Sequence, residues 1–406
     1  MLASRSAAYL AAILSFAYIQ HYSLKGIPVT ILELALLLLL AIYVVEKLAR
    51  REAFPGPSRT PYFWPVCLLL AAAAIAVYFA PDRRAAAGIW KAYFVEPALA
   101  AYVLADILRS RWDLEKLVGG FFVGGIIVAV FNILFFLFAA ATGWPSLVDH
   151  PPVAIYNTPN ATGLFLGPLL ALGLAMLLFG NRSERTRAAV FTVFAAPAVI
   201  LSFSRGAWLA LLVASLFLAW HTRHRLMAYA AAAGAVVVAV ALPPLRRRIE
   251  HELNPNDPLN SMTTRFHLWR ATLDMMRHGR YPLTGTGLSG FRTDIAPYSK
   301  FAGYNENLIY PHNIFLNFWT ETGLLGLAAA AWTMVTWVRL ALGGIRRGGP
   351  RRVYHLGLAA AGLTIVVHGL IDVPFFKNDL AWLTFALMGM QVAALRQDLA
   401  GSAATG

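Results

Sequence analysis

Continuous apolar runs of membrane length are the feature that most constrains the fold of this chain. Ile31–Val45, Val66–Ala80 and Phe121–Ala141 contain almost no charged residue. A membrane-spanning helix needs about 20 apolar residues. Lipid leaves only helices or a closed barrel as spanning structures, and continuous rather than alternating runs favour helices. Charged residues make up 13% of the chain and mean hydropathy is +0.61, against about 25% charged residues in soluble domains. The sequence therefore predicts an all-α polytopic membrane protein.

The apolar runs predict about twelve transmembrane helices with short connections and one long loop. We expect spans near 7–20, 27–46, 61–80, 88–108, 117–142, 159–180, 188–203, 206–220, 226–243, 313–342, 355–371 and 379–395. This divides the chain into helices 1–9 over 1–243, a large partly helical loop over 244–312, and helices 10–12 with a short tail over 313–406.

Basic residues fall mainly in loops on one side of this topology. The short loops on the other side carry only Lys25, Arg83, Arg84, Arg205 and Lys377. Because Lys and Arg collect in cytoplasmic loops, both termini are predicted to be cytoplasmic and the long loop periplasmic. Much of the net charge of +14 then follows from topology, and no nucleic-acid partner is expected. The single cysteine, Cys67, excludes a disulfide and a cysteine-based metal site.

The long loop is unusually rich in arginine and ends in Tyr310-Pro311-His312-Asn313, where the next apolar run begins. Its arginines are Arg246, Arg247, Arg248, Arg265, Arg270, Arg277, Arg280 and Arg292. A basic loop that leads to a histidine at a helix start is typical of an enzyme that handles an anionic, lipid-linked substrate. His is a suitable general base near neutral pH; the alternative for His312 is a capping or core histidine.

Two arginines stand out as phosphate-binding candidates. Arg205 lies in a tight connection between predicted spans, where a guanidinium can pair with phosphate or extend to lipid headgroups. Arg265 flanks the start of a predicted amphipathic helix over 263–276, capped by Thr263 or Thr264. The apolar face of that helix is predicted to be Phe266, Trp269, Leu273 and Met276, lying on the membrane. The alternative for Arg265 is a solvated arginine on a surface helix.

Other polar positions have more than one interpretation. His368 and Asp372 are four residues apart, which places them on one face if the helix continues; Asp372 then orients a histidine or pairs with Lys377. His251, His267, His278 and His312 share the outer side without metal-binding spacing, so no metal is expected.

Two further features remain. The string Gly285-Thr286-Gly287-Leu288-Ser289-Gly290 predicts a tight turn that needs glycine rather than a nucleotide site, and no cofactor is expected. Glu33 and Glu96 lie in apolar runs and are expected to be paired or pore-facing.

Several motifs in this order resemble the O-antigen ligase and polymerase superfamily of bacterial membrane proteins. They are Asn157-Thr158-Pro159-Asn160, Ser204-Arg205-Gly206, Arg265 with Trp269, Pro282-Leu283-Thr284-Gly285-Thr286-Gly287, and Pro311-His312-Asn313 leading into Asn317-Phe318-Trp319-Thr320-Glu321-Thr322-Gly323. The resemblance covers about the second half of the chain, and the first half matches only in hydropathy.

The resemblance implies a twelve-helix, GT-C-like glycosyltransferase of the bacterial inner membrane, with its active site on the periplasmic face. A ligase of this kind joins O-antigen from undecaprenyl pyrophosphate to a lipid A-core sugar, with inversion and without metal or nucleotide. His312 would be the base, and Arg205 and Arg265 would hold the diphosphate. Further substrate-binding candidates are Arg292, Lys91, Arg84, Tyr310, Asn313, Asn160 and Asp372.

The resemblance leaves other functions open. An O-antigen polymerase and a protein O-oligosaccharyltransferase share the loop pattern. A transporter of lipid-linked glycans is the alternative outside this chemistry, but transporters place charged residues around a midplane cavity. The basic residues here concentrate on one face of the membrane, which favours surface chemistry.

Overall fold

The computed structural model describes residues 3–18, 21–24, 27–144, 153–223, 260–299 and 309–403, with single positions 225, 226, 229, 246, 250 and 254. These residues are mostly helical, as expected for an all-α membrane protein. The predicted span at 226–243, and much of the long loop, lie outside the described residues.

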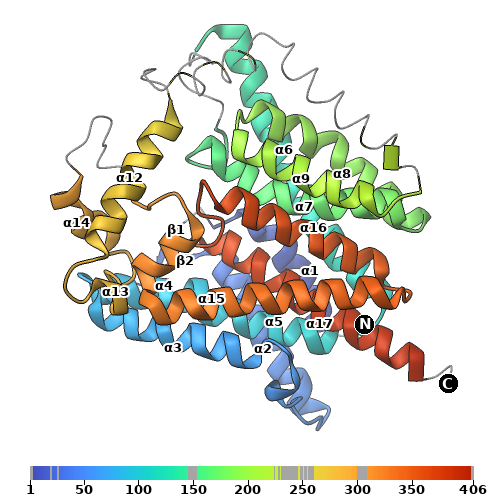
Figure 1. Cartoon of the computed structure of the whole chain (residues 1–406). Helices are drawn as coiled ribbons and strands as arrows, with labels where there is room; N and C mark the ends of the chain where they lie inside the picture. The colour runs from blue at the N-terminus through green and yellow to red at the C-terminus, as the bar shows by residue number, and fades with distance from the viewer. Residues whose placement is uncertain are drawn as a thin grey trace.

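The first half of the chain is a series of helices (Figure 1). Its elements are α1 (Ala3–Ile13), a short 3-10 turn (Leu14–Phe16), β1 (His21–Leu24), β2 (Ile27–Thr30), α2 (Ile31–Ala49), a 3-10 turn (Pro57–Arg59), α3 (Phe63–Phe79), α4 (Arg83–Ile89), a π-helical segment (Trp90–Val95), α5 (Glu96–Ile107) and α6 (Arg111–Thr142).

The second half supplies the segments that carry most of the polar motifs. Its elements are α7 (Pro159–Phe179), α8 (Arg182–Leu201), α9 (Arg205–Trp220), α12 (Ser261–Met275), α13 (Tyr281–Thr284), α14 (Phe291–Ile295), a 3-10 turn (Ala296–Tyr298), α15 (Ile314–Arg347), α16 (Arg352–Gly369) and α17 (Asn378–Ala403).

Three helices of the described residues are long and apolar enough to cross a membrane: α6, α7 and α15. Two shorter apolar helices, α3 and α9, lie within other predicted spans. The expected span over 88–108 is helical without a break through Ile107, and a π-helical segment joins α4 to α5 within it. Asn181 caps α8 together with Glu184, which starts that helix earlier than the predicted residue 188.

A β-hairpin replaces the start of the second predicted span. β1 pairs antiparallel with β2, with His21 opposite Thr30 and Leu24 opposite Ile27. Pro28 lacks the N–H that a helix interior requires, and the Thr30 side chain accepts a hydrogen bond from the Glu33 N–H and begins α2. The second helix therefore begins at Ile31 rather than at residue 27, and the fold is not purely α-helical.

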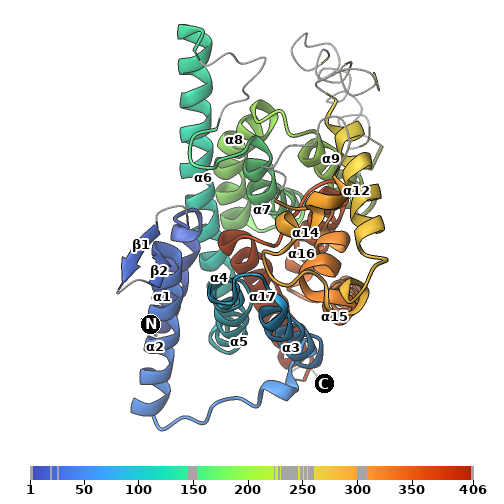
Figure 2. The same ribbon diagram turned by 90° about the vertical axis from the view of Figure 1, so that its left-hand side faces the viewer.

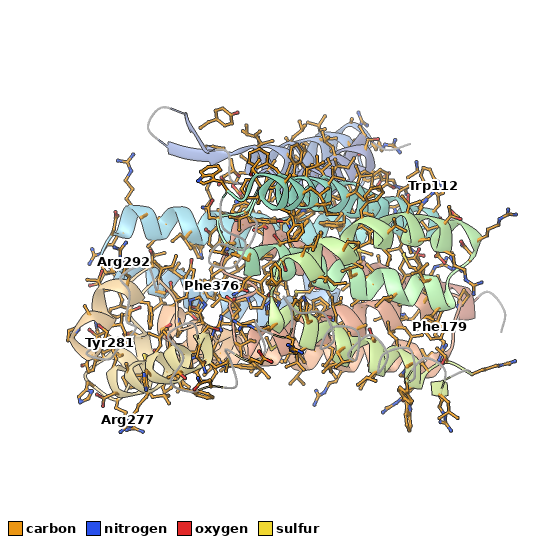
Figure 3. The ribbon with its side chains drawn as sticks, turned by 90° about the horizontal axis from the view of Figure 1, so that it is seen from above. Trp112, Phe179, Arg277, Tyr281, Arg292 and Phe376 are labelled. Atoms are coloured by element: carbon orange, nitrogen blue, oxygen red, sulfur yellow. The ribbon has the colours of Figure 1, made fainter. Side chains whose placement is uncertain are left out.

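The helices surround α7 and α17, and the described chain ends lie away from α12–α14 (Figure 1). The hairpin, α1 and α2 lie at the edge opposite α12 (Figure 2). Seen from above, Arg277, Tyr281 and Arg292 lie at one end of the molecule, and Trp112 and Phe179 lie at the other (Figure 3). The molecule therefore has two distinct ends.

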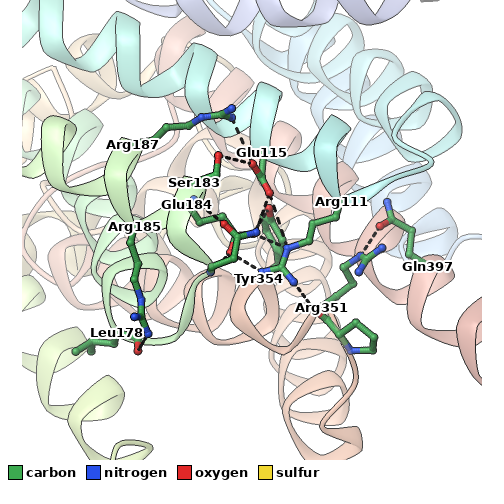
Figure 4. A network of polar contacts seen from close by, with 12 residues as sticks. Arg111, Glu115, Leu178, Ser183, Glu184, Arg185, Arg187, Arg351, Tyr354 and Gln397 are labelled. Carbon is green, nitrogen blue, oxygen red and sulfur yellow. Dashed lines mark hydrogen bonds and ion pairs between the residues drawn. The ribbon is translucent and has the colours of Figure 1, made fainter.

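At the end of the molecule that carries Trp112 and Phe179, a network of charged groups joins neighbouring helices (Figure 4). Arg111 donates from Nε to Glu184 over 2.8 Å, and the Tyr354 hydroxyl donates to the same carboxylate over 2.8 Å. Glu115 accepts hydrogen bonds from Asn181 and Ser183. Burial would raise the pKa of Glu184, but its hydrogen bonds from Arg111, Asn181 and Tyr354 lower it. The network connects α6, α8 and α16.

The helix α12 differs from its prediction in its cap. Asn260 is the cap, and its side chain accepts from the Thr263 N–H over 3.0 Å; the predicted cap at Thr263 or Thr264 was wrong because the helix begins earlier. Leu268, Ala271 and Met275 are buried against α14. Of the predicted apolar face, Met276 is buried in the same cluster, while Phe266 and Leu273 are exposed, and the placement of this face on the membrane stays a prediction.

Candidate active site

Two arginines that are far apart in the sequence meet at one serine hydroxyl. Arg205 is the first residue of α9, and Ser261 is the first residue of α12. Arg205 donates from Nη2 to the Ser261 Oγ over 3.0 Å, and Arg265 donates from Nη1 to the same atom over 2.7 Å. Two guanidinium groups held this close repel each other, and an anion bound between them would offset that repulsion. The arrangement therefore favours binding of an anionic group.

Within the described residues, Arg265 forms no ion pair with a carboxylate, and its buried Nε has no hydrogen-bond partner. Its positive charge instead helps to lower the pKa of the Asp372 carboxyl. The Arg265 guanidinium therefore keeps donor capacity for a ligand such as phosphate, which accepts guanidinium donors bidentately.

His312 lies directly before α15 and pairs with a carboxylate from the end of α16. Its Nδ1 lies 3.3 Å from the Asp372 Oδ1. The other Asp372 oxygen accepts from Asn160 Nδ2 at the start of α7 over 2.8 Å, and the Val373 N–H donates to Oδ1 over 2.8 Å. No described residue engages Nε2 of His312, whose side chain is 26% exposed. One ring nitrogen is thus oriented by Asp372, and the other is open to substrate.

Asp372 is held as an anion beside the imidazole. Burial alone would raise the pKa of its carboxyl, but the hydrogen bond with His312 and the neighbouring His312, His368 and Arg265 lower it well below the ordinary value. A permanent carboxylate stabilises a protonated His312 ring. This is the arrangement that a general base needs after it has accepted a proton.

The expectation that His368 and Asp372 share a helix face was wrong. The helix α16 ends at Gly369, so Asp372 lies in the following turn. Its hydrogen bonds go to His312 and Asn160, and no ion pair with Lys377 occurs among the described residues.

The backbone of His312 has a left-handed conformation, with φ of 49°. Such an angle is uncommon for a residue with a side chain and is maintained by surrounding contacts. Trp269 donates from Nε1 to the Pro311 carbonyl over 2.8 Å, and Asn313 donates to the Leu370 carbonyl over 2.9 Å. Asn313 also caps α15 through the N–H groups of Phe315 and Leu316. Contacts from α12 and α16 thus fix His312 from both sides.

Sequence reasoning did not select Ser261, Ser204 or His368 as site residues. His368 is buried, and its Nε2 lies 3.5 Å from the Ser204 Oγ. A methyl group at Gly206 would come within 2.6 Å of the His368 ring, so glycine lets α9 approach α16. The Ser204-Arg205-Gly206 motif was a signal for this region, but no local pattern indicates that Ser261 contacts both arginines.

The remaining predicted residues lie in different settings. Tyr310 donates to the Phe376 carbonyl over 3.2 Å, next to the His312 pair. Lys91 forms ion pairs with Glu33 over 2.8 Å and Glu96 over 3.3 Å, which confirms that these glutamates are paired. Arg84 and Arg292 are exposed, at α4 and α14.

A glycine turn supports the start of α15. Gly285, Gly287 and Gly323 have positive φ, which confirms the predicted need for glycine in the turn over 285–290. The Gly285 backbone passes so close to the Thr320 carbonyl that a methyl group would overlap it, and the Thr286 N–H donates to Thr320 over 2.7 Å. Among the described residues, no group of three or more His, Cys, Asp or Glu is arranged to hold a metal ion.

The comparison with known families places this geometry in context. Residues 190–331 match the O-antigen ligase family model, a segment that contains Arg205, Ser261, Arg265 and His312 but neither Asn160 nor Asp372. No curated protein gives a significant sequence match to the chain. Residues 190–331 are thus similar to the O-antigen ligase family, and this similarity supports a function of the ligase or polymerase type.

Proposed function

We propose that this protein is an O-antigen ligase of the bacterial inner membrane. It transfers O-antigen polysaccharide from undecaprenyl pyrophosphate to a sugar hydroxyl of lipid A-core, on the periplasmic face. The observation that carries the proposal is the convergence of Arg205 and Arg265 on Ser261, near an open His312 nitrogen backed by Asp372. Cations for a diphosphate and a base for a hydroxyl are thus gathered in one place.

In the proposed reaction, Nε2 of His312 takes the proton of the acceptor hydroxyl as the oxygen attacks the anomeric carbon of the donor glycan. The bond between that carbon and the diphosphate oxygen breaks, and undecaprenyl pyrophosphate leaves with the bonding electrons. Arg205 and Arg265 stabilise the charge that develops on the leaving diphosphate. Asp372 stabilises the protonated His312, which later releases its proton to solvent. A single displacement inverts the anomeric configuration.

The proposal is tested with purified protein, undecaprenyl-pyrophosphate-linked glycan and lipid A-core, in the presence of EDTA. We expect ligated product from the wild type. His312→Ala should lower turnover by about 10²-fold to 10⁴-fold, and Arg265→Ala by about 10²-fold to 10³-fold. The matched controls are His278→Ala and Arg270→Ala, which change exposed residues of the same loop and should leave turnover near the wild-type value.

The same assay separates the related functions. Growth of the glycan when only the lipid-linked donor is supplied would make the protein a polymerase. Transfer to a protein acceptor would make it a protein O-oligosaccharyltransferase. Absence of transfer to every acceptor, with passage of the lipid-linked glycan between leaflets, would make it a transporter.

A further inference from the structure

Beside His312 lies a group of buried polar side chains that the proposed chemistry does not use. We define the tyrosine–carboxylate cluster as Tyr18, Tyr93, Tyr156, Tyr310, Glu321 and Asp379. Electrostatic interactions join Asp379 to Tyr18, Tyr93 and Tyr156, and Glu321 to Tyr93 and Tyr310. The rings of Tyr18 and Tyr156 lie 5.9 Å apart. Residues from α15, α17, the π-helical segment and three connections thus meet in one place.

The cluster contains buried polar atoms that no described residue satisfies. Among the described residues, Oε1 of Glu321 has no hydrogen-bond partner, while the Tyr156 hydroxyl and the Asp379 carboxyl interact with each other. The neighbouring atoms Asn378 Oδ1 and Trp382 Nε1 are also buried without a hydrogen-bond partner. All of these side chains are at most 3% exposed. Buried polar groups are normally hydrogen-bonded because an unmade bond is costly, so the cluster is suited to a ligand with many donors and acceptors.

The chemistry of the cluster selects a neutral, hydroxyl-rich ligand. The carboxyl groups of Asp379 and Glu321 can exchange hydrogen bonds with hydroxyl groups. The Trp382 indole and the Tyr156 phenol can donate in return. Tyr18, Tyr93 and Tyr310 remain partly exposed, and their rings offer apolar faces above the buried carboxylates. We propose that the tyrosine–carboxylate cluster is the subsite that binds the sugar ring of the acceptor, which rests on the proposed function.

The position of the cluster fits that role, because the same chain segments carry both sites. Tyr156 precedes Asn160, which bonds to Asp372. Tyr310 precedes His312 by two residues, and its hydroxyl donates to the Phe376 carbonyl between Asp372 and Asp379. An acceptor hydroxyl held by the cluster is therefore presented toward His312. The donor diphosphate is held by the cationic side of the site, at Arg205 and Arg265.

A purely structural role for Asp379 makes a different prediction. Asp379 lies in the first turn of α17, where a carboxylate stabilises the positive end of the helix dipole. Loss of that role would lower stability and affect donor and acceptor kinetics alike. Loss of an acceptor subsite would change the acceptor alone.

The test compares Asp379→Asn and Tyr156→Phe with Asp398→Asn and Tyr354→Phe. The control pair changes the same residue types, also buried, near the end of α17 and near the start of α16. In the transfer assay, we expect the first pair to raise the KM for lipid A-core about 10-fold, the effect of losing one hydrogen bond to a charged group. The KM for the lipid-linked donor and the thermal midpoint of Asp379→Asn should stay at wild-type values.

Binding is measured separately from turnover. Core oligosaccharide freed of lipid is titrated by calorimetry into wild-type protein and into Asp379→Asn. Binding that depends on Asp379, without any transfer by the wild type, would support the subsite and refute the proposed reaction. Transfer with an unchanged acceptor KM in both variants would refute the subsite alone. A parallel rise of donor and acceptor KM with a lower thermal midpoint would also overturn it in favour of the helix-capping role.

Discussion

At the scale of single residues, the His312–Asp372 pair divides its tasks between two ring nitrogens. Asp372 engages Nδ1, and this fixes both the ring orientation and the tautomer that leaves Nε2 as the acceptor. Asn160 and the Val373 N–H hold the carboxylate in turn. The base is therefore positioned by groups that do not themselves touch the substrate.

This arrangement predicts a loss of activity for Asp372→Asn. The amide keeps the size of the side chain but removes the charge that stabilises the imidazolium formed when His312 accepts a proton. We expect kcat/KM to fall roughly 10-fold to 100-fold. The measurement is kcat/KM for both proteins. Equal values would show that Asp372 has no influence on the proposed base.

Ser261 offers a second test at this scale. Its hydroxyl accepts from both Arg205 and Arg265, so Ser261→Ala should let the two guanidinium groups move apart. We expect Ser261→Ala to raise the KM for the lipid-linked donor about 10-fold. Ser261→Thr keeps the hydroxyl and should have a donor KM close to the wild-type value. Equal donor KM values in all three proteins would contradict a role for Ser261 in donor binding.

At the scale of elements, the packing of α9 against α16 depends on one glycine. A methyl group at Gly206 would lie 2.6 Å from the His368 ring and 2.9 Å from Ile371. We expect Gly206→Ala to destabilise the protein by about 1 to 3 kcal/mol, and to reduce transfer because Arg205 is the next residue. Thermal unfolding and the transfer assay check this. Gly88→Ala, which meets no atom within 4 Å, is the matched control.

The elements also show what sequence patterns can and cannot predict. Apolar runs identify α3, α6, α7 and α15 because burial in lipid imposes length and composition. The same runs misplace the start of the second span, since β2 depends on strand pairing and on Pro28 rather than on hydropathy. The π-helical segment at 90–95 and the cap at Asn260 likewise depend on tertiary packing and on one local hydrogen bond.

The same division applies to the candidate site. Arg205, Arg265 and His312 are found in the sequence because each lies in a motif. The partner of Asp372 cannot be read from the sequence. Lys377 is only five residues away, yet the residue that pairs with Asp372 is His312, which is 60 residues away. Only the turn that follows Gly369 decides between them. No local sequence pattern predicts that both arginines contact Ser261.

At the scale of the whole molecule, the Glu184 network opposite α12–α14 should contribute stability rather than activity. Breaking a buried ion pair costs about 3 to 5 kcal/mol, but Arg111 is 30% exposed, so we expect about 2 to 3 kcal/mol for Glu184→Gln. Because the pKa of Glu184 is lowered by folding, this stability is present above its ordinary value and is lost as pH falls. The thermal unfolding midpoints of the wild type and of Glu184→Gln, measured at several pH values, should therefore converge in acid. Midpoints that differ equally at every pH would contradict this.

Asn160, Arg205, Ser261, His312 and Asp372 are spread over more than half of the chain, and Asp372 is the last of them to be synthesised. A ribosome that has completed the segment matched by the family, 190–331, has already made both arginines and the histidine. The carboxylate that orients His312 follows only after α15 and α16. The proposed cationic side of the site is thus synthesised before the carboxylate that orients the proposed base.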